Sequence, residues 1–168
     1  MSTAKTFFYM GVDIGSVSTK LVILDDKKRV VAGCCLPTAG NPANALRKGL
    51  LRVQSDIQPS DELAGVAVTG SGRKLAGELI GADIIKNEIT CQAVSALHTD
   101  RNVQTVIEIG GQDSKLIVVR EGLVVDFGMN TVCAAGTGSF LDHQASRLGI
   151  SLDEMSQLAD KSQKPVTI

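Results

Sequence analysis

Hydrophobic residues follow two patterns along the chain, and together these predict alternating strands and helices. Short runs of Val, Ile and Leu between glycine or charged residues are typical of β-strands. Apolar residues at three- and four-residue spacing are typical of helices, as at Ala43, Leu46, Leu50 and Val53. The expected strands cover residues 7–14, 20–24, 30–36, 63–69, 82–85, 106–109, 114–119 and 123–127, and the expected helices cover 43–56, 74–80, 88–98 and 138–148, with a last helix from Ser151.

This order of elements predicts an α/β protein made of two halves. Residues 1–100 supply the strands and helices of a first subdomain, and residues 101–168 begin a second one. The second half has fewer strands, and residues 164–168 resemble the start of another. A half-built sheet would leave an unpaired edge and an uncovered apolar face. We therefore expect a fragment whose second half is incomplete.

The composition indicates a folded domain with an aliphatic core. Hydrophobic residues make up 43% of the 168 residues and aromatic residues only 3%, so Val, Ile, Leu and Ala must fill the interior. The net charge of −1 gives no basic field for nucleic acid. No apolar run has membrane-spanning length, and the first residues lack the apolar segment of a signal peptide. We expect a cytoplasmic protein that binds neither nucleic acid nor a membrane.

The four cysteines do not form a pattern that predicts a zinc site. Cys34, Cys35, Cys91 and Cys133 show no C-x-x-C spacing, and in the cytoplasm they are expected to be reduced. The first three are interpreted as packing residues. Cys34 and Cys35 are neighbours on one expected strand, so one side chain should point inward and the other outward.

The first stretch with candidate chemistry is G-V-D-I-G-S-V-S-T-K-L-V-I-L, which begins at Gly11. It reads as a strand, a tight polar turn and a second strand. Asp13, at the end of the first strand, is a candidate Mg²⁺ ligand, directly or through water. The turn, residues 15–19, offers backbone N–H groups and hydroxyls, and Lys20 offers a point charge. These groups are suited to binding phosphate.

The second stretch is I-E-I-G-G-Q-D-S-K, in which Gly110 and Gly111 separate two apolar strands. Glycine permits a tight turn without a Cβ atom, so a phosphate could approach the backbone N–H groups closely. Gln112 could position a water molecule, and Asp113 could hold Mg²⁺. This turn is therefore a second candidate phosphate site.

The third stretch is C-A-A-G-T-G, where Gly136, Thr137 and Gly138 open an expected helix. Helix N-termini attract anions through free N–H groups and the helix dipole. Cys133 precedes this helix by a few residues, a position that should lower a thiolate pKa and favour metal ligation or reactivity. A buried inert thiol is the alternative, and one cysteine from each subunit could also ligate a cluster at a symmetric interface.

Each motif also has an ordinary structural explanation, because short glycine motifs in hairpins and capped helices are common. The same holds for residues 70–73, G-S-G-R, which are interpreted as a strand-to-helix connection more than as a ligand contact. The occurrence of two similar hairpin motifs is more specific than either motif alone. D-x-G-S…T-K and I-G-G-Q-D-S-K both place an acid and a lysine at a hairpin turn, which suggests two related halves facing one nucleotide.

These motifs, with V-T-G-S-G-R, K-N-E-I-T-C-Q-A and M-N-T-V-C-A-A-G-T-G-S-F-L, resemble the activator family of 2-hydroxyacyl-CoA dehydratases. That family includes benzoyl-CoA reductase-type ATPase subunits. The resemblance extends from Gly11 to about Asp160, and C-A-A-G-T-G is highly specific. It implies an actin-like ATPase fold, in which two RNase H-like halves surround a nucleotide cleft.

The resemblance also implies cofactors and partners. Such activators are homodimers that bind ATP or ADP with Mg²⁺, and one [4Fe–4S] cluster bridges the subunits through two cysteines from each. Cys133 matches the first cysteine, and the second would follow a few residues beyond Ile168. The family couples ATP hydrolysis to transfer of a low-potential electron to a dehydratase or reductase partner.

The candidate residues follow from these motifs together with the resemblance. The cofactor-binding residues are Asp13, Gly15, Ser16, Ser18, Thr19, Lys20, Gly110, Gly111, Gln112, Gly136, Thr137 and Gly138; the catalytic residues are Gln112 and Asp113; the metal ligands are Cys133 for the cluster and Asp13 and Asp113 for Mg²⁺. Two other classes stay open. One is a sugar or acetate kinase-like ATPase without a cluster, against which Cys133 argues, and the other is a non-enzymatic nucleotide sensor.

Overall fold

The computed structural model describes residues 7–57, 62–130 and 136–164. By its internal contacts the chain divides into two compact units. Unit 1 comprises Met1–Val106 and Ile117–Phe127, and unit 2 comprises Ile107–Leu116 and Gly128–Ile168. The division therefore passes through the strands after residue 104. The boundary expected after residue 100 stays a prediction.

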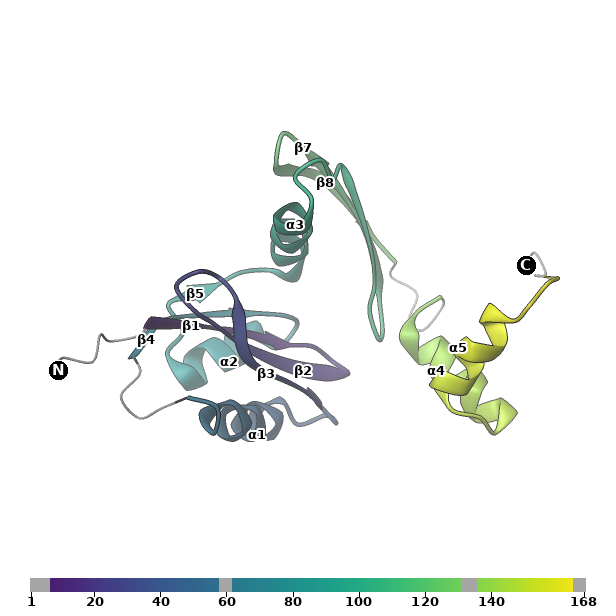
Figure 1. Cartoon of the computed structure of the whole chain (residues 1–168), viewed down its shortest axis with the longest axis horizontal. Coiled ribbons are helices and arrows are strands. Elements are labelled where there is room, and N and C mark those ends of the chain that lie inside the picture. The colour runs from purple at the N-terminus through teal and green to yellow at the C-terminus, as the bar shows by residue number, and fades with distance from the viewer. Residues whose placement is uncertain (1–6, 58–61, 131–135, 165–168) are drawn as a thin grey trace. The chain divides into compact units, whose positions relative to one another are not determined.

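Unit 1 is built on a five-stranded sheet with the order β3-β2-β1-β4-β5 (Figure 1). The antiparallel strands are β1 (Phe7–Ile14), β2 (Ser18–Leu24) and β3 (Val30–Pro37). β4 (Glu62–Thr69) runs parallel to β1, and β5 (Ile84–Ile85) runs parallel to β4. The parallel strands require helical crossovers, which α1 (Pro42–Gln54) and α2 (Arg73–Ile80) provide.

Alternation along the strands sends one set of side chains into the core of unit 1. On β1 and β2 the buried residues are Met10, Val12, Ile14, Leu21 and Ile23, each at most 7% exposed. Helices α1 and α2 cover this face of the sheet with Leu46, Val53 and Ala76, among others. The intervening residues of the strands, Asp13 and Lys20 among them, point to the opposite face of the sheet.

A second sheet has the order β6-β7-β8, formed by β6 (Thr105–Ile109), β7 (Ser114–Arg120) and β8 (Leu123–Met129). In unit 1, helix α3 (Glu88–Thr99) packs on β7 and β6 through a small cluster of Ala93, Ile117, Val119 and Val106. Asn87 caps the helix, because its side chain accepts a hydrogen bond from the Thr90 N–H at 2.8 Å. The cap stabilises the start of the helix, and the cluster packs the helix on the strands.

Unit 2 also contains α4 (Gly138–Leu148) and α5 (Leu152–Asp160). Gly149 ends α4 with a φ of 69°, in the left-handed region that suits glycine. Ser151 and Glu154 then form a capping box that starts α5. Residues 149–151 alone join the two helices, and these stop and start signals explain so short a loop.

Every strand and helix expected within the described residues is present, with shifted ends. Pro42 was expected in a loop but opens α1, because proline fits the first helical turn and Asn41 caps it. β2 begins at Ser18, two residues earlier than expected. The expected strand at 164–168 lies almost wholly outside the described residues. In the part of the chain that the structure describes, no helix is long and apolar enough to cross a membrane.

Candidate functional site

The turn between β1 and β2 is held by backbone and side-chain hydrogen bonds. The Gly15 N–H donates to the Ser18 carbonyl at 3.0 Å, and a Cβ on Gly15 would lie 2.9 Å from that oxygen. Thr38 fixes the other side, because its N–H donates to the Val17 carbonyl and its hydroxyl to the Gly15 carbonyl, each at 2.8 Å. The turn is therefore preorganised, and Ser16 stands exposed at its tip.

Asp13 and Lys20 lie directly opposite each other on β1 and β2. Lys20 Nζ is 3.3 Å from Asp13 Oδ2, and the two side chains are 54% and 33% exposed. Both predicted phosphate-site charges thus stand together beside the turn and remain accessible to solvent. A carboxylate in this position suits a hard cation such as Mg²⁺, which takes one or two protein carboxylates and keeps several waters.

Two predicted residues of this hairpin belong to the strand instead of the turn. Ser18 and Thr19 are the first residues of β2. Thr19 is fully buried, and its hydroxyl is hydrogen-bonded to that of Thr38 at 2.9 Å. Its side chain therefore faces the core side of the sheet and stabilises the hairpin. A contact between Thr19 and a cofactor stays a prediction.

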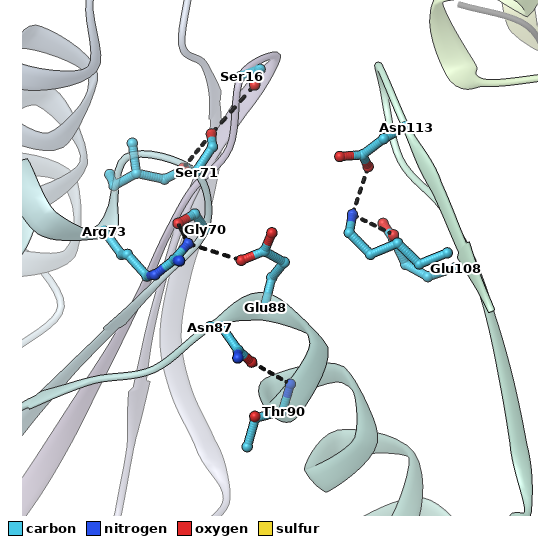
Figure 2. A network of polar contacts seen from close by, with 11 residues as sticks. Ser16, Gly70, Ser71, Arg73, Asn87, Glu88, Thr90, Glu108 and Asp113 are labelled. Carbon is cyan, nitrogen blue, oxygen red and sulfur yellow. Dashed lines mark hydrogen bonds and ion pairs between the residues drawn. The ribbon is translucent and has the colours of Figure 1, made fainter. Parts of the chain in front are cut away.

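The loop between β4 and α2 packs tightly against the end of β1. Gly70 has a φ of 91°, and a Cβ there would lie 2.5 Å from Asp13 Oδ1 and still closer to the Ile14 carbonyl oxygen. The Gly72 N–H donates to the Ile14 carbonyl at 2.9 Å. The Ser71 hydroxyl lies 3.3 Å from that of Ser16 at the tip of the first turn (Figure 2). This loop, interpreted from sequence as a connection, thus supports Asp13 and touches the turn.

Arg73 fixes the same loop from below. One guanidinium nitrogen donates to the Gly70 carbonyl at 2.9 Å and pairs with Glu88 at 3.0 Å, at the start of α3 (Figure 2). Both partners of the ion pair are about one-third exposed, so solvent weakens the pair only in part. The loop backbone is therefore tied to two helices of unit 1.

The turn between β6 and β7 in unit 2 has the same backbone hydrogen bond as the first turn. The Gly110 N–H donates to the Asp113 carbonyl at 2.8 Å. Lys115 lies beneath it with a side chain only 5% exposed, and its Nζ contacts Asp113 Oδ1 at 2.6 Å and Glu108 Oε2 at 3.1 Å (Figure 2). Burial alone would lower the pKa of Lys115, but hydrogen bonds to Asp113 and Glu108 outweigh burial and raise that pKa.

The start of α4 is docked on this turn. The N–H groups of Gly138 and Ser139 donate to the carbonyls of Gly110 and Gly111, both at 2.9 Å, and the Ser139 hydroxyl also contacts the Gly111 carbonyl. A Cβ on Gly138 would lie 3.3 Å from the Gly110 oxygen, so glycine permits the close approach. Two of the N–H groups expected to attract an anion are therefore already used in joining the helix to the turn.

Two buried hydroxyl groups have no hydrogen-bond partner among the described residues. They belong to Thr137, the N-cap of α4, and Thr69, the last residue of β4. Buried polar groups are nearly always paired, so such exceptions call for an explanation. Thr137 was predicted to contact a cofactor, and its unpaired hydroxyl is consistent with that prediction.

Comparison of the two hairpins identifies a residue that the sequence analysis missed. Asp13 and Glu108 each stand two residues before the glycine of their turn, and Lys20 and Lys115 each stand five residues after it. In both hairpins the acid contacts the lysine. The residue equivalent to Asp13 is therefore Glu108, and the predicted role of Asp113 at Mg²⁺ stays a prediction. The shared spacing, an acid two residues before the turn glycine, is the sequence signal that identifies Glu108.

The structure brings the other predicted residues together within each unit. Asp13, Gly15, Ser16 and Lys20 gather at the first turn, and Gly138 contacts the second turn, which residues 110–113 form. Gln112 is exposed on its turn. Cys133 lies outside the described residues. Within the described ranges, no three His, Cys, Asp or Glu side chains gather as a metal site.

The other cysteines lie as the sequence indicated. Cys34 packs against the core of unit 1, and Cys35, its neighbour on β3, is exposed. Cys91 is half-buried on α3. None of these three forms a disulfide.

Comparisons with known proteins give a family match and related activators of known structure or sequence. The model of the BadF/BadG/BcrA/BcrD ATPase family matches residues 10–168. The (R)-2-hydroxyglutaryl-CoA dehydratase activating ATPase of Acidaminococcus fermentans is 35% identical over 97% of this chain and 62% of its own length. The activator of 2-hydroxyisocaproyl-CoA dehydratase from Clostridium difficile, solved with bound ADPNP, is 34% identical, with a TM-score of 0.80 over 96% of this chain and 59% of that one.

These matches confirm the expected actin-like ATPase fold. The ethanolamine utilization protein EutJ of Carboxydothermus hydrogenoformans has a TM-score of 0.65 at 18% identity, over 92% of this chain and 61% of that one, which shows likeness of fold alone. The chain spans about three-fifths of the length of the curated activating ATPase that it matches.

Proposed function

The chain belongs to the BadF/BadG/BcrA/BcrD ATPase family, and from this membership we propose that it binds and hydrolyses ATP as part of an activator. The enzyme it serves is a 2-hydroxyacyl-CoA dehydratase or a benzoyl-CoA reductase-type component, because relatives carry these names. The activator acts in the cytoplasm. Hydrolysis of ATP drives a low-potential electron to that partner.

One observation carries the nucleotide part of this proposal. The activator solved with bound ADPNP matches 96% of this chain, and the family match over residues 10–168 includes both glycine hairpins. The local geometry supports the same conclusion. Each hairpin turn is closed by an N–H···O bond from its glycine and has a carboxylate and an ammonium beside it, a combination suited to phosphate and its magnesium ion.

The residues have distinct tasks in this proposal. Lys20 and the exposed turn of residues 15–17 bind phosphate oxygens at the first hairpin, where the accessible ammonium supplies positive charge. Asp13 holds Mg²⁺ or one of its waters, and this ion supplies neutralisation of the phosphate charge. At the second hairpin, Gln112 stands exposed where it can orient a water molecule for attack. Asp113 and Glu108 supply the carboxylates there.

The proposal extends to an iron–sulfur cluster through the resemblance. Cys133 is assigned as a ligand of a [4Fe–4S] cluster that two subunits of a homodimer share. Cys133 is close in sequence to Thr137 and Gly138, and Gly138 donates to the turn of the second hairpin. A change at that turn on nucleotide binding therefore has a short path to the cluster ligand, through one hydrogen bond and a few residues of chain, as in hinge-type switches between two states.

The nucleotide proposal is tested by binding and turnover. Purified protein should bind an ATP analogue in the presence of Mg²⁺, and the Asp13→Asn variant should lose most of the Mg²⁺-dependent part of that affinity. Lys161→Met, which removes an exposed charge at the end of α5, is the matched control and should bind as the unaltered protein does. Equal affinity with and without Mg²⁺, or no binding at all, would contradict the proposal.

The cluster proposal needs its own measurement. Protein reconstituted with iron and sulfide without oxygen should hold about four irons per dimer, with visible absorption that a Cys133→Ala variant lacks. The Cys35→Ala variant is the control, since Cys35 is exposed and has no assigned role. If neither the protein nor the variants hold iron, the function reduces to that of an ATPase without a cluster.

A further inference from the structure

Lys115 is the buried cation of the second hairpin. Its side chain is 5% exposed, whereas its partners Glu108 and Asp113 are 21% and 41% exposed. Both ion pairs end on the same ammonium nitrogen, at 3.1 Å and 2.6 Å (Figure 2). The two carboxylates therefore share one buried cation, and Asp113 is the more exposed of the two.

This arrangement differs from that at the first hairpin. Lys20 is 54% exposed and, among the described residues, pairs with one carboxylate, that of Asp13, at 3.3 Å. It is free to reach a ligand at the cost of a weak surface pair. Lys115 would have to leave two carboxylates and a buried position, which is far more costly. Equivalent lysines in the two hairpins are therefore suited to different tasks.

We propose that Lys115 serves as an internal cation, which holds Glu108 and Asp113 in place and prevents them from binding a divalent ion when no nucleotide is present. The inference deepens the proposed function, on which it rests, because it concerns how Mg²⁺ is admitted to the same hairpin. Lys115 is a positioning residue in this role. It contacts the carboxylates and acts through them.

The physical reason lies in the charges and their spacing. Two carboxylates aimed at one point are the oxygen ligands that Mg²⁺ and Mn²⁺ prefer. An ammonium at that point satisfies the same charges and repels a second cation, and burial strengthens both effects. Free divalent ion is thus excluded. A Mg²⁺ ion that arrives on a nucleotide brings phosphate oxygens as ligands, so it needs only one or two protein carboxylates. The more exposed Asp113 can then coordinate the ion while Glu108 remains paired with Lys115.

The experiment measures binding of Mn²⁺ without nucleotide, by the loss of the free-ion signal in electron paramagnetic resonance. Lys115→Met should bind Mn²⁺ at least about tenfold more tightly than the unaltered protein, because two carboxylates lose the cation that they share. Lys115→Arg keeps the charge and should bind as the unaltered protein does. The double variant Lys115→Met with Glu108→Gln should lose the gain, which assigns it to this hairpin and not to Asp13.

Folding is checked first by circular dichroism, since an uncompensated pair of carboxylates destabilises the hairpin. If Lys115→Met does not fold, the Glu108→Gln variant, which keeps Lys115, tests whether the hairpin binds Mn²⁺ without nucleotide. The proposal expects Glu108→Gln to leave nucleotide-free Mn²⁺ binding unchanged, because Lys115 already excludes the ion there. A weaker Mn²⁺ affinity in Glu108→Gln would show that the unaltered hairpin binds the ion, and would overturn the proposal.

Equal Mn²⁺ affinity of Lys115→Met and the unaltered protein would overturn it as well. The outcome is distinct from failure of the proposed function, because no nucleotide is present in this assay. A protein that binds no ATP analogue refutes the proposed function, while the Mn²⁺ titration still reports whether Lys115 keeps divalent ions from the two carboxylates.

Discussion

Gly70 provides the strictest test of how unit 1 supports Asp13. It combines a φ of 91° with a position where a Cβ atom would overlap the Ile14 carbonyl oxygen and lie 2.5 Å from Asp13 Oδ1. The backbone of Ile14 also accepts the Gly72 N–H, so it is held in place. A Gly70→Ala variant must therefore distort the loop, the end of β1 or both.

The expected loss of stability has two parts. The left-handed backbone costs about 1–2 kcal/mol for a residue with a Cβ atom, and the overlap adds about 1–3 kcal/mol, as for other insertions into packed regions. Gly40→Ala measures the first part alone, because Gly40 has a φ of 70° and nothing within 4 Å of its Cβ position. We expect a loss of about 1 kcal/mol for Gly40→Ala and about 3 kcal/mol for Gly70→Ala.

The measurement is urea unfolding followed by circular dichroism, with both variants and the unaltered protein at one pH. Both glycines belong to unit 1, so the comparison concerns the same cooperative region. The difference between the two variants isolates the close approach to Asp13 and Ile14. If both lose the same free energy of unfolding, the tight packing of this loop on β1 is refuted and only the backbone conformation matters.

Three further substitutions test other parts of the structure. Asn87→Ala should cost about 1 kcal/mol in urea unfolding through loss of the α3 cap, and a loss below a few tenths would contradict that cap. Lys20→Met should change stability by at most about 1 kcal/mol, since its pair with Asp13 is exposed, yet it should weaken binding of an ATP analogue. Hydrogen bonds from the Arg29 backbone, the Arg29 guanidinium and the Lys27 backbone lower the pKa of Asp25 in the folded protein below 3.8. The stability that Asp25 contributes is therefore complete above pH 3.8 and is lost as the pH falls through the folded pKa. In Asp25→Asn the free energy of unfolding should depend less steeply on pH in this acid range.

The sequence predicted the strands and helices well because their signals are local. Alternation of buried and exposed positions along β1 and β2 is a property of the strand itself, and the residues that start and stop helices act within a turn. The errors also have local reasons. Pro42 belongs to α1 because Asn41 caps the helix one residue earlier than expected. Ser18 belongs to β2 because the turn closes by a bond between Gly15 and Ser18.

The candidate site was predicted less completely, since its contacts join residues far apart in the chain. Thr38, which fixes the first turn, and Gly70, which packs on Asp13, lie in other elements. No local pattern gives their positions. The docking of α4 on the second turn is likewise a tertiary contact, made by Gly138 and Ser139. Motifs therefore identified the turns, and packing decided which groups on them remain accessible.

The two hairpins differ most at one position of a shared frame. Both place an acid two residues before the turn glycine and a lysine five residues after it. The third residue after the glycine is Ser18 in the first hairpin and Asp113 in the second, and in both its backbone carbonyl accepts the bond that closes the turn. Only Asp113 adds a carboxylate within reach of the lysine. That second carboxylate, together with burial, holds Lys115 inside the protein, whereas Lys20, which is itself exposed and pairs with the partly exposed Asp13, remains available to a ligand.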